Sequence, residues 1–256
     1  KAETTGSKLQ RGYQWGGEPR KDRQTGTYKQ EVLNRPLLCF HHPRVMGAVK
    51  AKIKAFMSRY PAIDGIAFDG IGYRNYHDCR CSVSKERYRS YCREHGREPG
   101  DAAWRDFSLD TLVNFNNALV DCVHDLDTEA TTVNHIWPVY LPEPLYGNRL
   151  KVDCCGQTAA WFFSWELSKI ERYTGVITKE ANKHWPGVTG VAFIGYYDAD
   201  RLSGLFPYKS PERVEKELRA IREGGANMLM VCGLKDVVDN PEIAAVFEKY
   251  MADDQE

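Results

Sequence analysis

Carboxylates and aromatic rings stand at the downstream ends of several apolar segments of this sequence. Asp69 closes the apolar run 63–69, and Tyr73, Arg74 and Tyr76 follow it. This pattern is typical of a site that binds or cleaves sugars, because rings stack on the apolar faces of sugars while carboxylates bind hydroxyl groups or transfer protons. Aspartate beside glycine also caps turns, so a structural role for Asp69 is the alternative.

Residues suited to a sugar site also follow three other apolar segments. Parallel strands of an α/β barrel present their carboxyl ends at one edge, so we expect these segments to end at a shared mouth. The residues expected to bind substrate there, besides the three that follow Asp69, are His135, Trp137, Gln157, Trp161, Tyr196 and Tyr197. The combination suggests carbohydrate without being specific for it.

Cleavage of a glycosidic bond needs two carboxyl groups, one acting as nucleophile or base and the other as general acid. Asp69 is the candidate for the first role. Two residues compete for the second: Asp153, expected to end a strand at 150–154, and Glu143, held between prolines in the loop 141–147. Asp153 is slightly preferred because a strand would fix its position. The alternative for Asp153 is a hydrogen-bonded structural acid, and the alternative for Glu143 is a solvated loop residue.

Histidines and cysteines offer two other chemistries. His41, His42 and His135 are candidate ligands of a metal-dependent hydrolase, but no H-x-x-x-H or H-E-x-x-H spacing is present, which favours hydrogen-bonding roles for them. Cys154 or Cys155 with His135 as base would make a thiol hydrolase, although strand-end cysteines are more often buried and inert.

A cysteine cluster at Cys79-x-Cys81, followed by Cys92, weakly suggests a structural zinc site. A zinc loop of the C-x-C-x2-C type would place a third cysteine at position 84, where this chain has Ser84. We therefore expect no metal and no cofactor.

Composition restricts the choice of partner. The chain has 35 basic and 35 acidic residues and no long run of like charge, so neither nucleic acid nor an anionic membrane is an expected partner. No apolar stretch is long enough to span a membrane, and the start does not resemble a signal peptide. We expect a soluble protein, secreted or cytoplasmic, that binds a neutral oligosaccharide or polysaccharide.

Strand and helix patterns alternate through most of the chain, which predicts an α/β fold with a parallel sheet. Expected strands are 37–40, 63–69, 131–137, 150–154, 188–196 and 226–232, and expected helices are 44–59, 83–95, 104–127, 165–183, 211–223 and 241–251. Because no strand is followed by a nucleotide-binding glycine loop, a single (β/α)8 TIM-type barrel over residues 1–256 is preferred to a doubly wound sheet.

The strand count falls short of a full barrel. Six strands at most are visible, so the barrel is expected to lack its first two strands in this chain. An open barrel would expose two unpaired strand edges. We therefore expect the missing wall to come from an upstream segment, a partner chain, or strands within residues 1–36.

The passage YPAIDGIAFDGIGYRNY resembles the fourth strand of glycoside-hydrolase-like (β/α)8 barrels, in which D-G-I-x-x-D ends that strand. In retaining α-glycosidases such as the dextranase family the final aspartate is the nucleophile, and this implies the same role for Asp69. The resemblance also implies that the acid comes from the fifth or sixth strand, where Glu143 and Asp153 fall. The glutamate pair of the large β-glycosidase clan is absent, since residues 188–197 contain no Glu.

The sequence therefore favours a glycoside hydrolase or transglycosidase. A non-catalytic carbohydrate-binding barrel is the first alternative, and the metal-dependent hydrolase is the second. Fold alone does not choose among them, because barrels support many chemistries.

Overall fold

The computed structural model describes residues 20–21, 28–29, 39–69, 71, 80–136, 149–161, 165–183, 185–197 and 209–252. These fall into two compact units. One comprises Lys1–Tyr60 with Tyr73–Phe115, and the other Pro61–Gly72 with Asn116–Glu256. Whether the whole chain is one domain stays a prediction.

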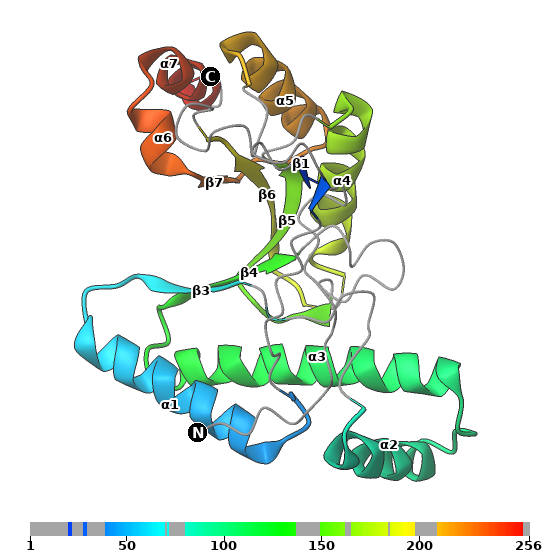
Figure 1. Ribbon diagram of the computed structural model, residues 1–256. Coiled ribbons are helices and arrows are strands. Elements are labelled where there is room, and N and C mark those ends of the chain that lie inside the picture. Colours follow the sequence, from blue (N-terminus) through cyan, green and yellow to red (C-terminus); the bar gives the residue numbers. More distant parts are fainter. Residues whose placement is uncertain are drawn as a thin grey trace. The chain divides into compact units, whose positions relative to one another are not determined.

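The second unit is built on a five-stranded parallel sheet whose strands follow one another in sequence order. These strands are β3 (Gly65–Asp69), β4 (Thr131–Ile136), β5 (Cys154–Ala160), β6 (Thr189–Gly195) and β7 (Leu229–Cys232). A doubly wound sheet would reverse its strand order at a switch point, and this sheet does not. It curls into part of a barrel, as the β3 to β7 ribbon shows (Figure 1).

Helices cover one face of this sheet. They are α4 (Leu167–Glu180), α5 (Pro211–Glu223), α6 (Leu234–Val238) and α7 (Pro241–Ala252). The sequence Ser210-Pro211-Glu212 places a polar cap before a proline in the first helical turn, a pattern that predicts a helix start. Ser210 accepts a hydrogen bond from the backbone N–H of Arg213 and caps α5 at that residue. The core between helices and sheet contains Ile170, Ile194, Leu218, Ile221 and Phe247.

The first unit is mainly helical. It contains α1 (Pro43–Arg59), α2 (Ser82–Glu94) and the first part of α3 (Asp101–His124), and two short antiparallel strands, β1 (Arg20–Lys21) and β2 (Tyr28–Lys29). Aromatic rings form its core: Tyr88, Trp104 and Phe107 lie within 5.6 Å of one another, centroid to centroid. None of the described helices is long and apolar enough to cross a membrane.

Two strand predictions were wrong. Residues 39 and 40 of the expected strand 37–40 form a turn, closed by the backbone N–H of His42 donating to the carbonyl of Cys39. The expected strand 150–154 precedes β5, which begins at Cys154. Leu150 and Val152 suggested a strand because both are apolar. Both are buried in the structure, but they lie in the segment that leads into β5. Among the described residues the sheet has five strands, and β1 and β2 pair only with each other.

Candidate active site

Alternation along the strands divides the sheet into a helix-covered face and an inner face. Ala192 and Ile194 of β6 belong to the helix-side core. Phe193, between them, packs with Cys154 and Val191 in a separate cluster. We call the face that carries this cluster the inner face. Since side chains alternate along a strand, residues in register with Phe193 on neighbouring strands share that face.

Asp69, the last residue of β3, is joined to the inner face by a chain of hydrogen bonds. Its Oδ1 lies 3.0 Å from Nδ1 of His135, whose Nε2 lies 2.7 Å from Oγ1 of Thr158. The pairing Asp69↔His135 places the two on adjacent parallel strands at the carboxyl edge. The His135 side chain is 5% exposed while that of Asp69 is 65% exposed. A buried imidazole therefore holds a carboxylate that faces solvent.

Packing fixes the plane of the His135 ring. The ring stacks on Phe193 with centroids 4.0 Å apart and planes inclined by 10°, and Trp161 lies 5.7 Å away on another side. Phe193 can occupy this position because β5 carries Gly156 there: a Cβ at Gly156 would lie 2.0 Å from the Phe193 ring. A larger residue at position 156 would displace the ring that supports His135.

The hydrogen-bond chain also assigns the imidazole protons. An ionised carboxylate only accepts hydrogen bonds, so Nδ1–H of His135 donates to Asp69. In the neutral ring Nε2 is then an acceptor, which matches the hydroxyl donor of Thr158. His135 thus acts as a positioning group for the Asp69 carboxylate.

The cysteines of the sheet are poor nucleophiles. Burial, with a smaller contribution from the Asp69 charge, raises the pKa of Cys232 to about 11. Burial raises the pKa of Cys155 to about 12 and also raises that of Cys154. All three thiols are protonated near neutral pH, so the thiol-hydrolase alternative gains no support.

Asp153 lies at the opposite edge of the sheet, and its predicted placement at a strand end was wrong. It precedes β5, and its Oδ2 accepts hydrogen bonds of 2.7 Å from both the backbone N–H and the hydroxyl of Thr132 near the start of β4. His124 lies 3.4 Å from the same oxygen. Burial opposes ionisation, but these partners together lower the pKa of Asp153. These contacts tie the starts of β4 and β5 together, whereas Asp69 lies at the carboxyl end of β3.

Gln157 and Tyr196 were expected to bind substrate, but they are buried away from the inner face. Gln157 is 0% exposed and follows Gly156, so its side chain points to the helix-covered side. Tyr196 is 1% exposed and belongs to the helix-side core, where its hydroxyl accepts a hydrogen bond from Asn240. The sequence analysis did not identify Thr158. Because His135 pairs with Gly156 and side chains alternate along β5, Thr158 shares a face with His135.

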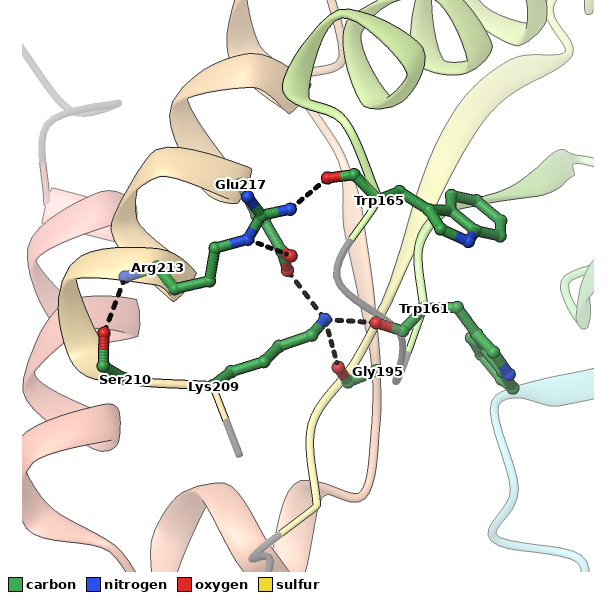
Figure 2. A network of polar contacts seen from close by, with 7 residues as sticks. All are labelled: Trp161, Trp165, Gly195, Lys209, Ser210, Arg213 and Glu217. Carbon is green, nitrogen blue, oxygen red and sulfur yellow. Dashed lines mark hydrogen bonds and ion pairs between the residues drawn. The ribbon is translucent and has the colours of Figure 1, made fainter. Parts of the chain in front are cut away.

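The backbone carbonyls of Trp161, Trp165 and Gly195 accept hydrogen bonds from a buried ion-pair network (Figure 2). Lys209 Nζ donates to the carbonyls of Trp161 and Gly195, which follow β5 and end β6, and lies 2.8 Å from Glu217 Oε2. Arg213 Nε is 2.8 Å from the other Glu217 oxygen, and its Nη2 donates to the carbonyl of Trp165.

Burial lowers the pKa of Lys209, and the Glu217 charge opposes that shift. Figure 2 shows both tryptophan rings pointing away from these cations while their carbonyls turn toward them. The network thus fixes the backbone at the carboxyl ends of β5 and β6 and leaves the Trp161 side chain directed away from it.

The histidines do not assemble as metal ligands. His41 hydrogen-bonds Ser84 through Nδ1 and Thr111 through Nε2, and His42 caps α1. Within the described part of the chain no three His, Cys, Asp or Glu residues are arranged to hold a metal ion. The metal-hydrolase alternative therefore has no structural support. Five predicted site residues lie outside the described residues: Tyr73, Arg74, Tyr76, Trp137 and Glu143. Tyr197 is half-buried and follows β6.

Solved glycosidase structures share this fold. The PgaB (BpsB) glycoside hydrolase domain from Bordetella bronchiseptica matches with a TM-score of 0.62 at 12% identity, over 91% of this chain and 69% of that chain. Bee venom hyaluronidase in complex with a hyaluronic acid tetramer matches with a TM-score of 0.52 at 14% identity, over 91% and 80% of the two chains.

Alpha-L-fucosidase isoenzyme 2 from Paenibacillus thiaminolyticus matches with a TM-score of 0.53 at 11% identity, over 91% of this chain and 33% of that chain. This chain thus spans about a third of the fucosidase. No protein-family model matches the sequence, and the search of curated proteins gave no match. The likeness establishes a glycoside-hydrolase-like fold.

Proposed function

We propose that this chain is a glycoside hydrolase, or a transglycosidase, that acts on a neutral oligosaccharide or polysaccharide with Asp69 as nucleophile or base. The observation that carries the proposal is the Asp69–His135 pair: a solvent-facing carboxylate at the carboxyl edge of a parallel sheet, held at 3.0 Å by a buried imidazole. In barrel enzymes the carboxyl edge is where catalytic residues are found. The glycosidase-like fold and the D-G-I-x-x-D pattern add support.

Five described residues, together with Glu143, which lies outside the described part of the chain, have distinct roles in this proposal. Asp69 attacks the anomeric carbon or activates water, and the His135 hydrogen bond keeps its carboxylate in one orientation. Thr158 and Phe193 hold the imidazole in turn. Trp161, beside His135, is the aromatic residue proposed to contact the sugar ring. Glu143 is the proposed general acid.

A carbohydrate-binding protein without catalysis is the second candidate. The specific observation in its favour is that Asp153 lies at the far edge of the sheet, which removes one of the two candidate acids. Binding would then use the same carboxylate and the same aromatic residue without bond cleavage.

The two functions are separated by screening the purified chain against a panel of aryl glycosides and neutral polysaccharides. A hydrolase releases product from at least one substrate, and Glu143→Gln slows a natural glycoside far more than an activated aryl glycoside, because a good leaving group needs little protonation. Saturable binding of a saccharide without turnover would support the binding protein instead. If the chain neither hydrolyses nor binds any member of the panel, both proposed functions are contradicted.

A further inference from the structure

Two cysteines of the first unit lie close enough to react with each other. Cys39 precedes α1, and Cys81 is the N-cap residue of α2. Their sulfur atoms are 3.7 Å apart although the residues are 42 positions apart in the sequence. Both are reduced thiols in the structure. A disulfide bond measures about 2.05 Å, so a small movement would bring the two sulfurs to bonding distance.

The two thiols differ in accessibility. Cys39 is 1% exposed, whereas Cys81 is only partly buried. In a thiol–disulfide exchange the accessible thiol meets the external disulfide, and a buried neighbour then resolves the mixed disulfide. Cys81 therefore has the position of the attacking thiol and Cys39 that of the resolving thiol.

Helix α2 favours negative charge on Cys81. The residue stands at the N-terminus of a 13-residue helix, where the unpaired backbone N–H groups attract an anion. The Ser84 hydroxyl oxygen lies 3.4 Å from each of the two sulfurs, on the side facing the helix start. The start of α2 thus favours a thiolate at Cys81, and the Ser84 oxygen lies within reach of an S–H hydrogen bond from either cysteine.

The neighbouring histidine determines how Ser84 is oriented. Thr111 donates its hydroxyl proton to the carbonyl of Phe107, so it accepts from Nε2–H of His41. Burial and the Arg87 charge lower the pKa of His41 to about 4, which keeps the ring neutral near neutral pH. Nδ1 is then an acceptor, and the hydroxyl at position 84 donates to it over 2.9 Å.

With its proton committed to His41, Ser84 presents oxygen lone pairs to both sulfurs. This arrangement orders the two S–H groups around one acceptor and keeps them together in the reduced state. It does not require a metal ion.

We propose that Cys39 and Cys81 form a redox-active dithiol that reacts with a low-molecular-weight disulfide such as oxidised glutathione. The Cys81 thiolate attacks the glutathione disulfide, forms a mixed disulfide and releases one glutathione thiolate. Cys39 then attacks the Cys81 sulfur, forms the Cys39–Cys81 bond and releases the second glutathione. Two protein thiols are oxidised, one glutathione disulfide is reduced to two thiols, and the two thiol protons pass through solvent to the released thiolates.

The test is equilibration of the whole chain in glutathione buffers of increasing oxidised fraction, followed by alkylation, intact mass measurement and peptide mapping. We expect the wild type to lose the mass of two hydrogen atoms and to yield a peptide cross-linked between Cys39 and Cys81. Cys39→Ala should stop at a mixed disulfide carrying one glutathione on Cys81. Oxidation should raise the melting temperature by roughly 5–10 °C, because the bond closes a long loop.

Matched controls are Cys92→Ala, in the core of the same unit, and Cys79→Ser, one residue removed from Cys81 in the C-x-C pattern. Both should still form the cross-link. Mapping on the wild type needs no variant, so a variant that fails to fold does not remove the test. Any of three results would overturn the proposal. They are a Cys79–Cys81 cross-link in place of the expected one, no cross-link in any buffer, and a tightly bound zinc ion that keeps both thiols reduced.

Discussion

Asp69 and Asp153 lie at opposite ends of the strands of the five-stranded sheet: Asp69 is the last residue of β3, and Asp153 immediately precedes β5. Oδ2 of Asp153 accepts two hydrogen bonds from Thr132 and lies 3.4 Å from His124, and the Asp153 side chain is 49% exposed. Asp69 ends β3, is held through one oxygen by His135 and is 65% exposed. The same residue type therefore serves two purposes. Oδ2 of Asp153 is held by groups near the starts of β4 and β5, and these contacts secure the strand starts. Oδ1 of Asp69 is held by His135 at the strand ends, where the contact orients a more exposed carboxylate.

The two edges also differ in what supports them. At the carboxyl edge the strand ends are anchored from behind by Lys209, which binds the carbonyls of Trp161 and Gly195. At the amino edge the aspartate itself is the anchor.

The sharpest test of this comparison is to substitute the two aspartates in parallel. With a substrate identified, Asp69→Asn should lower kcat by about 10³-fold or more, because the lost group acts in the transition state, while the melting temperature changes little. Asp153→Asn should keep kcat within about threefold. Both are measured by initial rates and thermal unfolding. Equal loss of activity in the two variants would remove the distinction between the edges.

Support of the carboxyl edge by the ion-pair network is tested with Glu217→Gln. This change leaves a buried lysine ammonium without its counter-charge, and we expect a loss of about 3–5 kcal/mol in the free energy of unfolding, measured by denaturant titration. Glu215→Gln, on the same helix but exposed, is the matched control and should unfold almost as the wild type does. A Glu217→Gln variant as stable as the control would show that the network does not anchor the strand ends.

The hydrogen-bond chain behind Asp69 is tested with Thr158→Val. The substitution keeps the shape of the side chain and removes the hydroxyl partner of His135, at a cost of about 1–3 kcal/mol in stability. We expect kcat to fall about tenfold with KM nearly unchanged, because a looser imidazole positions Asp69 less well. Thr174→Val, a buried threonine of α4, is the control and should lose stability without losing turnover. Unchanged turnover in Thr158→Val would limit His135 to a structural role.

The smallest expected effect concerns Asp153 and pH. Its pKa is lower in the folded chain than in the unfolded chain, so its contribution to stability is present above its ordinary value of 3.8 and is lost as pH falls through the folded value. Because the side chain is 49% exposed, the contribution is no more than about 1 kcal/mol. Asp153→Asn should therefore flatten the acid end of a stability–pH curve slightly. A steeper acid loss in the variant would contradict the assignment.

The sequence by itself determined the order and the types of the main elements of the sheet unit. The Ser210-Pro211 cap placed the start of α5 at the observed residue, and the run ending at Asp69 was recognised as a strand with its carboxylate at the end. These features are local: a cap, a proline and a short apolar run each act within a few residues. Alternation of strand and helix predicted the barrel-like fold, and the likeness to glycosidases came from the resemblance of residues 60–76 to a barrel strand of that family.

Tertiary structure decided which residues face the site. β5 (Cys154–Ala160) is a central strand buried on both faces, and such strands are usually continuous apolar runs. Small and polar residues make up much of β5, so neither an apolar run nor an alternation marks its bounds. Because Leu150 and Val152 are more apolar, the strand was predicted at 150–154, before the observed β5. Asp153 was therefore expected at the carboxyl end of a strand, although it precedes one. A shift of this kind also changes which side chains share a face, which is why Gln157 was chosen in place of Thr158.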